Sequence, residues 1–127
     1  MENLPNRPLS PNVKVYAWSW PMVASITHRI SGVVLVLFVP LYLWLFSTMV
    51  GSAQGFRCGV QVLHSFWGGL LLWLVGTALL YHFCNGIRFL LLDAAVAEQR
   101  EQMLQVARWP LLITAGGSIF LAAALIA

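Results

Sequence analysis

Charge is what this sequence most lacks: Asp, Glu, Lys and Arg together account for 9% of its 127 residues. A soluble domain normally carries about 25% charged residues. Hydrophobic residues make up 60% of the chain, and its mean hydropathy is +0.81. These values exclude a soluble catalytic domain. They predict an all-α membrane protein with room for three transmembrane helices of roughly 20 residues each.

Clustered basic residues are also missing. The seven Lys and Arg residues give a formal net charge of +3, but they are scattered along the chain, so we expect no nucleic-acid partner. The N-terminal stretch Met1 to Val15 has no apolar core of the kind that signal peptides carry. We therefore expect no cleavable signal there.

Cysteine is equally scarce, and the two cysteines are far apart, at Cys58 and Cys84. They form no CxxC pair and no zinc-type spacing. The CxxCH sequence is absent as well. Any haem in this protein would therefore be held without the covalent attachment found in c-type cytochromes.

Three long apolar segments are separated by two shorter stretches. We expect an extended N-terminal arm over residues 1–18, where three prolines disfavour helix, and a single transmembrane domain over residues 19–127. Ser19 and Pro21 are typical of a helix start. The expected spans cover approximately 21–50, 62–92 and 109–127, joined by a turn-rich loop over 51–61 and a polar connection over 93–108.

The distribution of basic residues predicts the orientation in the membrane. The N-terminal arm and the second connection lie on one side and together hold four of them: Arg7, Lys14, Arg100 and Arg108. The first loop, on the other side, holds only Arg57. The positive-inside rule then places the N-terminus in the cytoplasm or in the equivalent matrix compartment.

A histidine stands in the middle of the second apolar segment. Between Phe66 and Leu92 the ionisable side chains other than His82 are Tyr81, Cys84 and Arg88. An ionisable residue at such depth costs a few kcal/mol by insertion scales and marks a functional site by default. Haem iron would take the imidazole lone pair. A structural histidine bonded to a neighbouring helix is an equally weighted alternative on this observation alone.

The start of the first span carries a polar face. Ser25, His28, Arg29 and Gly32 follow one another at i, i+3, i+4 and i+7, which places them on one side of a helix. Such a face could line a quinone head or the propionates of a haem. It could equally be an interfacial pair reaching toward lipid phosphates, and for Arg88 this lipid-facing position is the favoured interpretation.

Several motifs together carry a family resemblance. They are Arg7-Pro8-Leu9-Ser10-Pro11, the block from Ala24 to Gly32 that reads ASITHRISG, the sequence His82-x3-Gly86-Ile87-Arg88, and Asp93. With the three spans, this pattern resembles the cytochrome b556 subunit of succinate dehydrogenase, the larger membrane anchor of respiratory complex II. The resemblance covers essentially the whole chain.

The resemblance implies a set of site residues and partners. His82 would be an axial ligand of haem b, Ser25 and Arg29 would contact quinone, and His28 with Arg29 would contact the haem propionates. The chain would form half of a haem-binding helical bundle that a sister anchor subunit completes. An iron–sulfur subunit and a flavoprotein subunit would carry out the succinate chemistry, so the chain would be a subunit of a succinate:quinone oxidoreductase that performs no succinate chemistry itself.

We expect a bacterial inner membrane rather than a mitochondrial one, with the N-terminus in the cytoplasm on the bias of basic residues. One position departs from the pattern, because many bacterial relatives have histidine where this chain has Phe89. Two alternatives stay open: the anchor of a fumarate reductase that works from menaquinol, and a haem-free structural anchor or transporter fragment.

Overall fold

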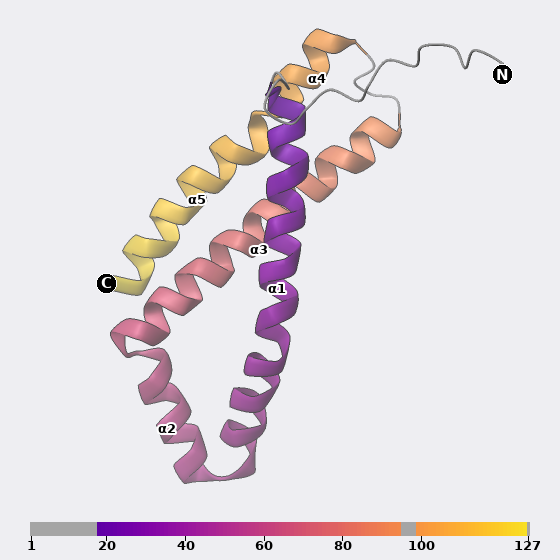
Figure 1. Ribbon diagram of the computed structural model, residues 1–127. Helices are drawn as coiled ribbons and strands as arrows, with labels where there is room; N and C mark the ends of the chain where they lie inside the picture. Colours follow the sequence, from indigo (N-terminus) through magenta and orange to yellow (C-terminus); the bar gives the residue numbers. More distant parts are fainter. Residues whose placement is uncertain (1–17, 95–98, 127) are drawn as a thin grey trace, which may run out of the picture.

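The computed structural model describes residues 18–94 and 99–126. Within these ranges the chain forms helices and no strand: α1 (Trp20–Gly51), α2 (Ala53–Leu63), α3 (Phe66–Asp93), α4 (Arg100–Val106) and α5 (Trp109–Ile126) (Figure 1). Three helical segments of the described chain are long and apolar enough to cross a membrane. The predicted all-α fold with three spans is therefore confirmed. The expected N-terminal arm lies outside the described residues, apart from Trp18.

Helix α1 is much longer than a bilayer requires. Its 32 residues correspond to about 48 Å at 1.5 Å per residue, compared with about 30 Å of hydrocarbon. It begins after Ser19, whose backbone is extended, and Pro21 stands in its first turn. The surplus length lets the first turns, which carry the polar face, lie near a membrane surface while the apolar remainder spans the lipid.

The expected loop over residues 51–61 is wrong, because most of it is helix α2. The side chain of Ser52 caps this helix by accepting a hydrogen bond of 2.9 Å from the backbone N–H of Gly55. Gly55 lies directly against the backbone carbonyl of Thr48 at the end of α1, where a side chain would not fit. The small residues that suggested a turn therefore serve as a cap and a close contact between two helices.

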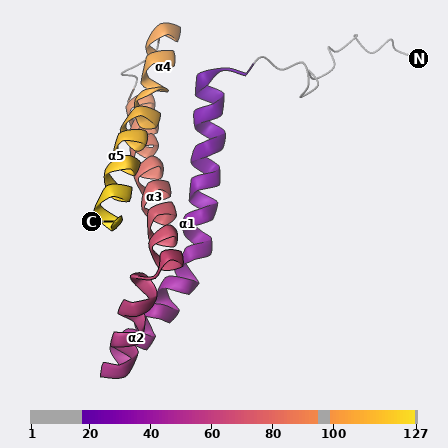
Figure 2. The same ribbon diagram turned by 90° about the vertical axis from the view of Figure 1, so that its left-hand side faces the viewer.

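The polar connection contains the short helix α4, which leads into α5. Helix α5 lies beside α3 along its length (Figure 2). The indole N–H of Trp73 donates to the backbone carbonyl of Ser118 at 3.0 Å, and the hydroxyl of Thr77 donates to that of Ser118 at 3.1 Å. In lipid, close packing and such interhelical hydrogen bonds hold helices together, because apolar burial gives no advantage there.

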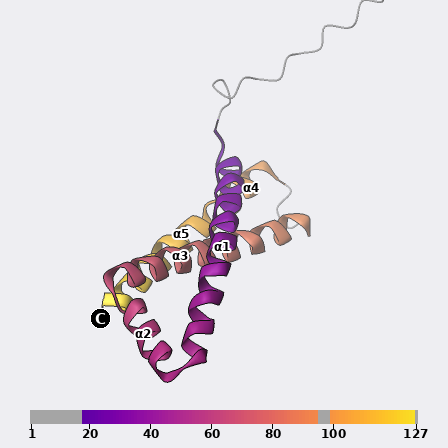
Figure 3. The same cartoon turned by 60° about the horizontal axis from the view of Figure 1, so that its bottom comes forward.

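Helix α1 crosses α3 in its own N-terminal half (Figure 3). Few apolar side chains are buried in the described chain, namely Ala24, Tyr81 and Ala107. Most leucines, valines and phenylalanines face outward. Such a surface suits contact with lipid and with other transmembrane helices. Most of the buried polar side chains of the described chain, Ser31, Asn85 and Arg88, belong to α1 and α3.

Candidate functional site

Where α1 and α3 cross, two side chains of α3 donate hydrogen bonds to one backbone carbonyl of α1, that of Ala24. Asn85 donates to it from Nδ2 at 2.8 Å, and the hydroxyl of Tyr81 donates to it at 3.2 Å. The Tyr81 hydroxyl also shares a hydrogen bond with Thr27. Asn85 and Ala24 are both completely buried. These bonds fix the register of the two helices one turn away from His82.

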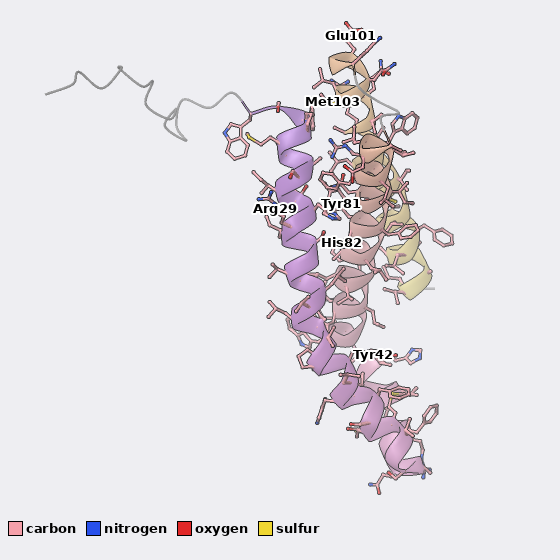
Figure 4. All side chains as sticks on the ribbon, turned by 90° about the vertical axis from the view of Figure 1, so that its right-hand side faces the viewer. Arg29, Tyr42, Tyr81, His82, Glu101 and Met103 are labelled. Atoms are coloured by element: carbon pink, nitrogen blue, oxygen red, sulfur yellow. The ribbon has the colours of Figure 1, made fainter. Side chains whose placement is uncertain are left out.

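His82 lies in the space between α1 and α3, beside Tyr81 (Figure 4). Its Nδ1 is 3.1 Å from the hydroxyl of Ser31 and 3.3 Å from the backbone carbonyl of His28. The Ser31 hydroxyl donates its own proton to that same carbonyl at 2.7 Å. Both neighbours of Nδ1 are therefore acceptors, and the network assigns the ring proton to Nδ1.

This tautomer leaves the lone pair of His82 on Nε2. Histidines that bind metals typically donate the other ring N–H to a carbonyl or a hydroxyl, which fixes the orientation of the ring. The edge of the ring lies on Gly32, where an added Cβ would stand 3.0 Å from Cε1. Gly32 thus provides the space in which the ring is seated.

His28 packs against the same ring. The two imidazoles stack with their centroids 4.0 Å apart and an interplanar angle of 10°. On its other side, His28 meets the ring of Phe89 at 5.3 Å. Its Nδ1 is buried and has no hydrogen-bond partner within the described chain. Phe89, the residue expected to depart from the family pattern, therefore contacts one of the predicted site residues.

Ser25 and Arg29 lie on the neighbouring flank of α1. Ser25 is half-buried, whereas Arg29 is exposed and lies on the side of α1 that faces away from α3 (Figure 4). An open groove of about 580 Å³ runs along this flank. Its lining includes Arg29, Gly32 and Val36 from α1 and His82 from α3.

The structure thus brings together two of the four predicted site residues, His28 and His82. It places Ser25 and Arg29 on the adjoining outer flank, where Arg29 lines the same groove as His82. The residues of the described chain contain no cluster of three or more His, Cys, Asp or Glu side chains that could hold a metal ion. A single imidazole with a free Nε2 fits the iron of a haem, which needs only axial ligands from protein.

The expected lipid-facing position of Arg88 is wrong. Arg88 is 4% exposed, and its Nη1 donates to Oδ1 of Asn85 at 3.4 Å. It lies on the face of α3 that also carries Tyr81 and Asn85, because the spacings of four and three residues bring these side chains to one side of a helix. This spacing was the signal that sequence reasoning missed, together with Thr27 and Ser31 on α1.

Fold and site together define a small multi-pass membrane anchor whose polar side chains meet where its first and second spanning helices, α1 and α3, cross. The sequence profile of the succinate dehydrogenase/fumarate reductase transmembrane subunits matches residues 3–125. The chain belongs to this family.

Individual relatives agree with this assignment. The succinate dehydrogenase cytochrome b556 subunit of Paracoccus denitrificans is 37% identical over 100 residues, covering 79% of this chain and 77% of that protein. The mitochondrial cytochrome b560 subunit of Homo sapiens is 32% identical over 125 residues, covering 93% and 71%. The cytochrome b556 subunit of Coxiella burnetii is 36% identical over 88 residues, covering 68% and 70%.

Proposed function

We propose that this chain is the larger membrane anchor of a succinate dehydrogenase, and that it binds haem b through His82 and forms part of a quinone-reduction site. The observation that carries the proposal is the hydrogen bonding of His82, whose Nδ1–H is held by α1 so that Nε2 is left for iron. When bound, haem supplies a one-electron redox centre inside the anchor. The relatives named above are subunits of succinate dehydrogenase, which favours this function over the fumarate reductase alternative.

The remaining residues of the site have distinct tasks in this proposal. Arg29 and His28 are the cationic and polar partners for the haem propionates, since guanidinium groups bind carboxylates strongly. Ser25 and Arg29 donate hydrogen bonds to a quinone carbonyl on the outer flank of α1. These bonds strengthen as negative charge develops on the carbonyl oxygen, so they favour reduction as well as binding.

The open groove on the outer flank of α1 supports the proposed assembly of this chain with other subunits. The groove beside His82 is open, and we propose that a second small anchor subunit covers it, completes the helical bundle and would supply a further ligand for the haem iron. The iron–sulfur and flavoprotein subunits dock on the side of the N-terminus. We place this side in the cytoplasm, with the protein in a bacterial inner membrane, on the bias of basic residues.

The test compares two electron acceptors in isolated membranes. Ser25→Ala and Arg29→Leu should slow the succinate-dependent reduction of added quinone roughly ten- to a hundredfold, because a lost charge-assisted hydrogen bond costs about 1.5–3 kcal/mol. Succinate oxidation by an artificial dye that bypasses quinone should stay unchanged. Arg57→Leu, on the predicted opposite side, is the matched control for a lost arginine.

Either of two results would contradict the proposed quinone site. Quinone reduction could stay at the wild-type rate in both variants, or dye reduction could fall as far as quinone reduction. The Ser25 variant should be milder than the Arg29 variant, because Arg29 also has a propionate to bind.

A further inference from the structure

Within the described residues, Arg88 is a buried arginine that has no acidic partner. The single hydrogen bond of Arg88 to the described residues is the 3.4 Å contact from Nη1 to Asn85. Its Nε is buried and makes no hydrogen bond to the described residues. Asp93, the next acidic residue along α3, is exposed. A guanidinium stays protonated in proteins, so the side chain carries a full positive charge at 4% exposure.

Asn85 orients this charge without cancelling it. Its Nδ2 is committed to the Ala24 carbonyl, so its Oδ1 is the atom that faces Arg88. The amide is neutral, and the bond to Arg88 is long. The charge therefore acts on its surroundings with little local compensation, in a medium where mobile ions screen buried charges far less than exposed ones.

The charge lies close to the proposed haem ligand. Arg88 follows His82 by six residues, which is about 9 Å along a helix. The guanidinium carbon is 5.2 Å from the centroid of Phe89, which in turn is 5.3 Å from the ring of His28. His28 stacks directly on His82. The neighbours of the charge toward the imidazole pair thus include the ring of Phe89 and the neutral amide of Asn85.

We propose that Arg88 is a fixed positive charge that raises the midpoint potential of the haem held by His82. This inference rests on the proposed function. Reduction adds one negative charge to the haem centre, and a nearby cation stabilises the reduced form relative to the oxidised one. Arg88 makes no hydrogen bond to His82, the proposed haem ligand, within the described chain. It therefore acts on the haem through its electrostatic field. The roles proposed above for Ser25, His28 and Arg29 stay the same under this inference.

The experiment is a spectroelectrochemical titration of the purified complex. In Arg88→Met the ratio of reduced to oxidised haem at a fixed applied potential should fall about tenfold, the size expected for one charge at about 10–15 Å with an effective dielectric constant near 20. Arg88→Lys should stay near the wild type because it keeps the charge. Asn85→Asp, which places a carboxylate beside Arg88 with almost no change in volume, should shift the ratio in the direction of Arg88→Met.

The matched control is Arg108→Met. Arg108 is exposed, with its guanidinium 5.6 Å from the ring of Trp20, and its loss should leave the titration unchanged. A merely structural Arg88 would alter assembly or haem content without a shift that follows the charge.

An unchanged potential in Arg88→Met, or an equal shift in Arg88→Met and Arg88→Lys, overturns the inference. If the Arg88→Met complex fails to assemble, the Asn85→Asp complex is titrated in its place. An unchanged ratio of reduced to oxidised haem in that variant also overturns the inference. These outcomes differ from a failure of the proposed function, in which the wild-type complex itself would show no b-type absorption.

Discussion

Gly32 offers the sharpest test of how His82 is seated. A Cβ at this position would stand 3.0 Å from Cε1 and 3.5 Å from Nδ1 of His82. The first distance is shorter than ordinary van der Waals contact, so in Gly32→Ala the imidazole must move by a few tenths of an ångström. The Nδ1 contacts to Ser31 and His28 are already 3.1 and 3.3 Å long, at the upper end of hydrogen-bond distances. These contacts cannot lengthen further and remain hydrogen bonds.

The expected cost follows from these bonds. Losing a neutral hydrogen bond costs about 0.5–1.5 kcal/mol, and 1.4 kcal/mol corresponds to a tenfold change in an equilibrium constant. Gly32→Ala should therefore weaken haem retention up to about tenfold, and Gly32→Val should weaken it further. The assay is the haem-to-protein ratio of the purified complex at increasing detergent dilution.

Two other glycines of the spanning helices provide the controls. An added Cβ at Gly69 or Gly116 meets no atom within 4 Å in the described chain. Gly69→Ala and Gly116→Ala should therefore retain haem as the wild type does. If Gly32→Ala behaves like these two variants, the imidazole is not seated against α1 as described.

Two further predictions concern packing and topology. Asn85→Leu should lower the stability of the assembled anchor by about 1–3 kcal/mol, because buried Arg88 loses its acceptor. The measurement is the midpoint of thermal unfolding. Phe83→Leu, a substitution at an exposed site, is the control and should leave the midpoint unchanged. An Asn85→Leu complex as stable as the control would contradict the polar network at Ala24. Exposed Cys58 should react with an impermeant thiol reagent from outside intact cells, whereas a thiol introduced at Gln99 should react only in inverted vesicles; the reverse pattern would overturn the orientation.

The three spans were predictable because lipid leaves a chain few choices. Backbone groups in a bilayer must be paired within the segment, so a long apolar run such as that between Gly32 and Val50 becomes a helix. The segment after it carries too few apolar residues for this rule. Its glycines and its serine are typical of turns, whereas Ser52 and Gly55 form a helix cap and a close helix contact.

The site was predictable as a set of residues but not as an arrangement. Ser25, His28, Arg29 and Gly32 occupy an arc of about 100° on α1, and helical spacing cannot tell which edge of that arc meets α3. The structure places His28 inside the crossing and Arg29 outside it. The burial of Arg88 was missed for a related reason, because the three-residue spacing puts Asn85 and Arg88 on one face of α3 but cannot show that this face meets α1.

The central claim is that the Nε2 lone pair of His82 binds haem iron. The direct measurement is the reduced-minus-oxidised absorption spectrum of the purified complex carrying His82→Ala, beside His64→Ala as a control. His64 is exposed at the junction of α2 and α3, so its loss should leave the b-type bands unchanged. We predict that His82→Ala abolishes or markedly alters these bands while the subunits still assemble. An unaltered b-type spectrum in the assembled His82→Ala complex would contradict the claim.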